Sequence, residues 1–190
     1  MPAEPTLRDL YARQLERVRD DPTAAACTTV GTARGWLLDT GVADLVAPFV
    51  TRLPDDDADL ARFAGLDGAT AALVLERLPA VELEDRQNDA PSLGALLTAA
   101  ARHPDEVELH GYLVGPGRTD ERLSAEGLFA YGAPDVASDP GHGAGCLCEE
   151  LWAWVQAELG VDDAVRMPDD IRPVLNRWRP YEPGWCLWWD

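Results

Sequence analysis

The sequence predicts an α+β fold, in which a helical N-terminal half packs on a small antiparallel sheet and helices complete the C-terminal part. Three observations lead to this prediction. Apolar residues recur at helical spacing in the N-terminal half, residues 107–131 contain two alternating runs around a turn-rich loop, and residues 185–189 alternate again.

The first predicted helix begins at a capping box. Thr6 can accept a hydrogen bond as the N-cap, and Asp9 stands three positions later, where it can return one. The apolar residues that follow share one helical face: Leu7, Tyr11, Leu15 and Val18.

Further helices are expected before residue 80. Residues 29–53 predict one or two helices with apolar faces. The aspartates at 55–57 favour the start of another helix that Gly65 would end, because acidic side chains stabilise a helix N-terminus. Residues 69–78 predict a short helix that stops at the following proline.

The middle of the chain changes character. Residues 80–83 predict a short strand, and a polar loop follows it. Pro91 suits the first position of a helix. The apolar residues after it recur at i, i+3, i+4 and i+7, which is typical of a helix: Leu93, Leu96, Leu97 and Ala100.

The strongest strand signal is the hairpin over residues 107–131. Residues 107–114 alternate in character, and residues 125–131 return after a loop rich in turn residues. Two strands alone are marginally stable, so residues 80–83 and 185–189 are the candidates to extend the sheet. Residues 146–159 and 168–178 predict the C-terminal helices.

The length predicts a single domain over residues 1–190. A change in character near residues 79–90 leaves a second interpretation open, with a helical subdomain 1–79 and an α+β subdomain 80–190. No apolar stretch reaches the length of a membrane span, and no secretory signal precedes the first helix. We therefore expect a cytoplasmic protein without membrane contact, and the residue usage suggests GC-rich bacterial coding.

The charge is strongly acidic. The chain has 34 acidic residues against 16 basic ones, all of them arginine, which gives a net charge of −18. Residues 1–53 are nearly neutral, so the excess lies in residues 54–190. Direct nucleic-acid binding is disfavoured because it needs a clustered basic face, whereas a protein partner with a basic surface would be attracted.

The segment 142–148 carries the first candidate site. His142, Cys146 and Cys148 are the residue types that zinc prefers, but a structural site needs four ligands. Cys186 or His110 would have to complete it. The same residues allow a second reading, in which Cys146 at a helix N-terminus is a catalytic nucleophile and His142 its base. Simple packing of the cysteines is the third reading, and zinc is the only cofactor that the sequence suggests.

The predicted hairpin carries a second candidate site, for a small ligand. Its side chains could gather on one surface, where two arginines could bind a carboxylate or phosphate. The candidate residues are His110, Tyr112, Arg118, Arg122 and Glu126. The alternative is a solvated loop with local ion pairs.

The C-terminus is rich in tryptophan. Trp178, Trp185, Trp188 and Trp189 either close the core or present an aromatic surface to a partner. In a strand over 185–189, Trp185, Leu187 and Trp189 would share one face, with Cys186 and Trp188 on the other.

These observations favour a non-enzymatic interaction or regulatory protein that binds a basic macromolecule. The chain lacks the common nucleotide, hydrolase and metalloprotease motifs, which favours a non-enzymatic role and leaves an enzyme as an alternative. The first alternative is an enzyme or small-ligand-binding protein that uses the hairpin face and the 142–146 loop. The second alternative is a small zinc protein.

Overall fold

A six-stranded antiparallel sheet organises the structure, a computed structural model that describes residues 5–21, 32–138 and 146–190. The strand order is β1-β2-β3-β4-β6-β5, and every neighbouring pair is antiparallel. The strands are β1 (Val50–Arg52), β2 (Leu60–Leu66), β3 (Val107–Val114), β4 (Arg122–Tyr131), β5 (Asp170–Val174) and β6 (Gly184–Trp188). The α+β prediction and the 107–131 hairpin are therefore confirmed.

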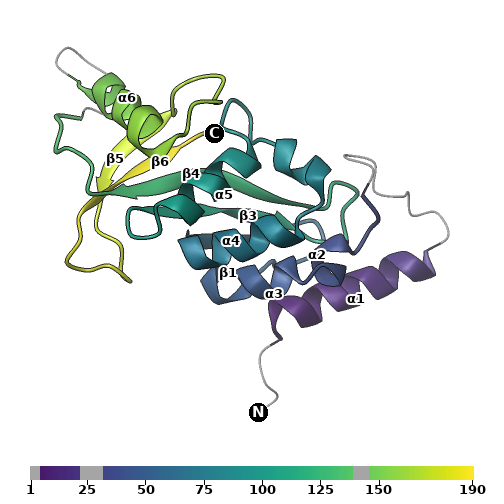
Figure 1. The fold of residues 1–190 in the computed structure, drawn as a ribbon. Coiled ribbons are helices and arrows are strands. Elements are labelled where there is room, and N and C mark those ends of the chain that lie inside the picture. Colours follow the sequence, from purple (N-terminus) through teal and green to yellow (C-terminus); the bar gives the residue numbers. More distant parts are fainter. Residues whose placement is uncertain (1–4, 22–31, 139–145) are drawn as a thin grey trace.

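Helices pack on one face of this sheet (Figure 1), where α4 and α5 lie side by side and α6 lies toward the β5–β6 end. The helical elements are α1 (Leu7–Asp20), α2 (Trp36–Asp39), α3 (Val42–Val46), the 3-10 turn η1 (Ala47–Phe49), α4 (Gly68–Arg77), the 3-10 turn η2 (Ala80–Glu84), α5 (Leu93–Arg102) and α6 (Cys148–Leu159). Among the described residues, no helix is long and apolar enough to cross a bilayer.

Several helix boundaries follow the local sequence rules. Thr6 and Asp9 form the reciprocal capping box at the start of α1. Asp67 caps α4, accepting from the Thr70 N–H at 2.8 Å. The cap of α5 is Ser92, so Pro91 precedes the helix and does not occupy its first position.

Four segments differ from the prediction, and each correction concerns a strand. Residues 60–66 form β2 and not the end of a helix, and residues 50–52 form β1. Residues 170–174 form β5 where a last helix was expected, so α6 is the C-terminal helix of the described chain. Residues 80–83 lie in the turn η2 and not in a strand.

The N-terminal half is therefore not purely helical, because it supplies two strands to the common sheet. Strand β2 pairs with β3 from Leu60 to Leu66, with a shift of register between Ala64 and Leu66 and with Phe63 opposite Gly111. Helix α4 also packs against α5, which lies beyond residue 80. Contacts thus cross the position at which two subdomains could have been divided.

The two faces of the sheet differ in chemistry. One face, here called the covered face, joins the helices in the main core through residues such as Leu109, Leu113 and Leu128. The opposite face, here called the polar face, carries Glu108, His110 and Tyr112 from β3, together with a small apolar cluster. That cluster consists of Phe129, Tyr131 and Cys186, with Ala64, Val174 and Trp188 against it.

Candidate functional site

A groove on the polar face is the first candidate site, with a volume of about 450 Å³. It spans the sheet from β1 to β5, and its wall combines aromatic, charged and titratable side chains. The residues that could contact a ligand are Arg62, His110, Glu126, Phe129, Asp170, Arg172, Cys186 and Trp188. Its volume lies within the range of small-molecule sites in proteins.

Two arginine–carboxylate pairs lie in the groove. The Nη1 atom of Arg62 donates to both carboxylate oxygens of Glu126 at 2.6 Å. The Nε atom of Arg172 lies 3.2 Å from Asp170. The charges of the two arginines and the two carboxylates cancel, so the net charge of the groove is close to zero although the protein is strongly acidic.

His110 and Cys186 meet at the floor of the groove, with 3.6 Å between the imidazole Nε2 and the thiol sulfur. Pairing of β4 with both β3 and β6 brings them together, since His110 lies opposite Gly127 and Cys186 lies opposite Phe129. A Cβ at position 127 would lie 1.9 Å from the Leu187 carbonyl oxygen and 2.8 Å from His110 Nε2. Glycine at this position therefore permits the close approach.

Burial keeps both groups neutral at pH 7. It lowers the pKa of His110 to about 4, and the nearby Arg172 and Arg62 act in the same direction. It raises the pKa of the Cys186 thiol to about 11, against the opposing effect of Arg172. A nucleophilic cysteine needs its thiolate, so this pair is not an activated nucleophile at neutral pH.

The β5–β6 connection, residues 175–183, is held to one end of the polar face by Glu108. This buried carboxylate accepts from Trp178 Nε1 at 2.6 Å, from Tyr131 Oη at 2.9 Å and from Arg179 Nε at 2.8 Å. Burial and the neighbouring Glu108 raise the pKa of the Tyr131 hydroxyl. The indole of Trp178 also meets the Phe129 ring edge-on at 5.9 Å.

The five hairpin candidates do not form one site. His110 and Glu126 line the groove. Arg122 donates to the Tyr112 hydroxyl at 2.9 Å, and its other branch bonds Asp120. Arg118 is bound to the same Asp120 carboxylate, so Asp120 already engages both arginines that could have bound an anion.

The C-terminal tryptophans differ in burial: some close the core, and others lie outside it. Trp185 and Trp189 belong to the main core, and Trp189 meets Trp152 of α6 edge-on at 5.5 Å. Trp188 lies on the opposite face with Cys186, as the alternation indicated. Trp178 is 44% exposed and lies before β6.

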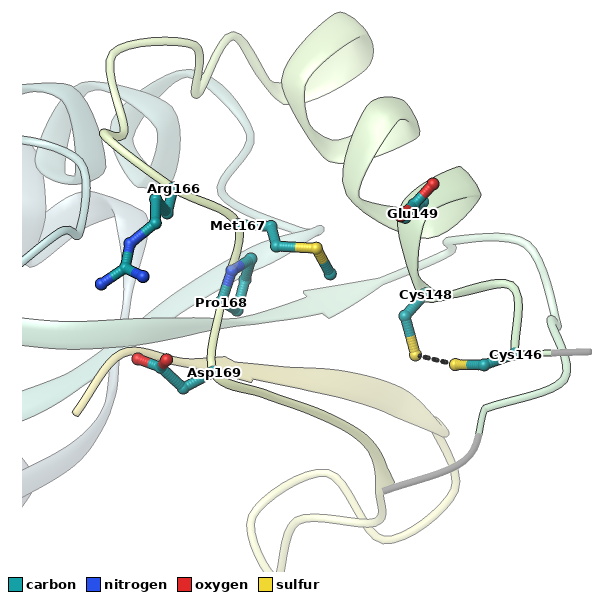
Figure 2. A pocket seen from close by; sticks show the side chains of 7 residues that line it. All are labelled: Cys146, Cys148, Glu149, Arg166, Met167, Pro168 and Asp169. Carbon is teal, nitrogen blue, oxygen red and sulfur yellow. Dashed lines mark hydrogen bonds between the residues drawn. The ribbon is translucent and has the colours of Figure 1, made fainter. Parts of the chain in front are cut away.

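Cys146 and Cys148 lie at a second pocket of about 340 Å³, beside the first turn of α6 (Figure 2). His142, the third candidate in this segment, lies outside the described residues, so neither its role as a zinc ligand nor its role as a base is addressed. Cys148 belongs to the main core whereas Cys186 lies on the polar face, so Cys186 does not join this pair. Within residues 5–21, 32–138 and 146–190, no three His, Cys, Asp or Glu side chains are grouped to hold a metal ion.

Sequence reasoning missed Arg62, Asp170 and Arg172 as groove residues. Their segments were expected to be helical, which would have placed these side chains elsewhere. No match to the chain was found among protein-family models, curated proteins or solved structures.

Proposed function

We propose that this chain is a non-enzymatic interaction protein whose partner is a basic macromolecule. The acidic excess carries the proposal. Even if each of the 16 arginines engaged one carboxylate, more than half of the 34 acidic side chains would have no arginine of their own. Such a charge steers association toward a partner of opposite sign.

The contact surface that we favour is the β5–β6 connection. Three of its large side chains face solvent, with exposed fractions of 62% for Leu175, 44% for Trp178 and 93% for Tyr181. Tryptophan and tyrosine are enriched among the residues that dominate binding energy at protein interfaces. The hydrogen bond to Glu108 orders the Trp178 indole in advance, which reduces the entropy lost on binding.

Acidic side chains border this connection. Arg179 donates to the backbone carbonyl of Asp105 at 2.9 Å, which brings the α5–β3 turn beside it. Asp105 and Glu106 in that turn are both exposed. The arginine itself is engaged by Glu108 and Glu182. An aromatic contact with an acidic margin suits a basic partner surface.

A capture experiment with matched variants tests the proposal. The immobilised protein is exposed to extract of its own host, and captured chains are identified and quantified. We expect one basic protein at a stoichiometric ratio, released by salt and lost with the double variant Leu175→Ser/Tyr181→Ser. The control is Leu73→Ser, because Leu73 on α4 is similarly exposed at 42% but lies on the helical side.

Two outcomes would remove the proposal. One is that the extract yields no basic chain at a stoichiometric ratio. The other is that capture by the double variant equals capture by wild type, since the β5–β6 connection would then not be the contact surface.

The groove on the polar face favours a second candidate function, the binding of a small zwitterion such as an amino acid or short peptide. The Arg172 side chain is 60% exposed and could engage a ligand carboxylate. The carboxylates of Glu126 and Asp170 could engage a ligand ammonium group, and Phe129 and Trp188 offer apolar contact.

Titration calorimetry with the free amino acids tests this second candidate. We expect saturable binding of at least one amino acid and its weakening in Arg172→Gln. The control is Arg77→Gln, on α4 away from the groove. The candidate fails if none of the amino acids binds, or if both variants bind as wild type does.

A further inference from the structure

The two cysteines at the start of α6 lie unusually close together. The sulfur of Cys146 lies 2.7 Å from the sulfur of Cys148, with a hydrogen bond between the thiols, and both side chains point toward one another (Figure 2). A disulfide bond is about 2.0 Å long. The sulfurs therefore need to move together by less than one ångström for a bond to form.

The backbone around the pair is held on both sides. The N–H of Leu147, the residue between them, donates to the Ala137 carbonyl at 2.8 Å. The Leu147 carbonyl accepts from Glu150 and Leu151 at 3.1 Å each, which fixes the first turn of α6. Cys148 itself is only 1% exposed and packs in the main core. Backbone hydrogen bonds of Leu147 thus fix the segment between the two cysteines.

The two thiols differ in access. Cys146 is partly exposed, whereas Cys148 is buried. The pocket beside them is lined by Met167 and Arg166, and Figure 2 shows the Met167 side chain extending toward α6. Both cysteines line this pocket, and Cys146 is the more exposed of the two, so we expect a small reagent to react first with Cys146.

We propose that Cys146 and Cys148 are a redox-active dithiol, which a low-molecular-weight disulfide such as oxidised glutathione converts to an internal disulfide. This inference is independent of the proposed function. Thiol–disulfide exchange would then take place at the α6 pocket.

The reaction has two exchange steps. The Cys146 thiolate attacks one sulfur of the reagent, forming a mixed disulfide and releasing the first glutathione thiol. The Cys148 thiolate then attacks Cys146, forming the internal disulfide and releasing the second glutathione thiol. Two electrons pass to the reagent, and the two protons lost by the protein thiols appear on the two released thiols.

Peptide mapping tests this proposal on the folded full-length chain. Cleavage after arginine places Cys146 and Cys148 together in the peptide 123–166, apart from Cys27 and Cys186. The protein is treated with oxidised glutathione, alkylated and digested. We expect this peptide to have lost two hydrogens and to resist alkylation, and dithiothreitol should restore two alkylation sites.

Single variants test the order of the steps. Cys148→Ser should accumulate glutathione on Cys146, because the resolving thiol is gone. Cys146→Ser should form no adduct at the buried Cys148. If Cys148→Ser proves unfolded by circular dichroism, Cys148→Ala serves instead. The proposal is overturned if wild type keeps two alkylatable cysteines in this peptide, or if it accumulates the mixed disulfide without closing it.

Discussion

The two faces of the sheet show how one strand serves two purposes. On β3, Val107, Leu109 and Leu113 enter the main core, while Glu108 and His110 lie on the polar face. The covered face is held by apolar burial, which is non-directional and tolerates approximate complementarity. The polar face is held by specific hydrogen bonds to charged groups. We infer that the covered face maintains the fold and that the polar face and its β5–β6 connection carry the function.

The largest expected effect on stability is the difference between alanine variants of two neighbouring tryptophans. Trp189 is fully buried against Trp152, so Trp189→Ala should lower the free energy of unfolding by about 3–5 kcal/mol. Trp188 is half-buried on the polar face, so Trp188→Ala should lower the free energy of unfolding by clearly less. Urea unfolding of both variants measures the difference. Equal losses would mean that the two faces do not differ in their contribution to stability.

The second prediction concerns pH and His110. The folded-state pKa of about 4 lies below the ordinary value of 6.5, so the unfolded chain takes up the proton first as pH falls. Above pH 6.5 His110 is neutral in both states, and its contribution to the free energy of unfolding is fully present. This contribution is lost as pH falls from 6.5 to 4, because the proton then stabilises the unfolded chain. It amounts to at most about 3 kcal/mol, since one pKa unit corresponds to about 1.4 kcal/mol.

Unfolding free energies of wild type and His110→Gln at pH 7 and pH 4 check this prediction, because the difference cancels the titration of the carboxylates. His103→Gln is the control, with a half-buried histidine beside Glu106 at 3.1 Å. The wild type should lose more stability than His110→Gln over this range. Parallel losses would show that His110 is not buried as described.

The sequence predicted the elements whose signals are local. The capping box at Thr6 and the apolar stripe of α5 each lie within a few residues, so nearby side chains alone decide them. Strand β2 was mistaken for a helix because its evidence is distant: Phe63 becomes a strand residue by pairing with Gly111. The contact between His110 and Cys186 depends on the register of three strands, and spacing along the chain gives no sign of it.

The third prediction concerns the carboxylate that anchors the β5–β6 connection. Glu108→Gln removes the charge that receives bonds from Trp178, Tyr131 and Arg179. We expect a loss of about 1.5–3 kcal/mol, which is typical for hydrogen bonds to charged groups. Glu106→Gln is the matched control, because its side chain is 49% exposed. If the two variants unfold at the same temperature, Glu108 does not anchor the β5–β6 connection.

The smallest expected effect is that of salt. With a net charge of −18, the folded chain repels itself, and screening should relieve this repulsion. The Tm at neutral pH should therefore rise modestly as sodium chloride is added. A falling Tm would show that the ion pairs across the polar face outweigh the repulsion among unpaired carboxylates.

Native mass spectrometry of the protein, purified gently from its own host at low salt, tests whether the chain binds a basic protein partner. We expect a complex with a second, basic polypeptide chain that dissociates when the ionic strength is raised. A protein that carries only a small-molecule mass would contradict it and would favour the second candidate function, the binding of a small ligand.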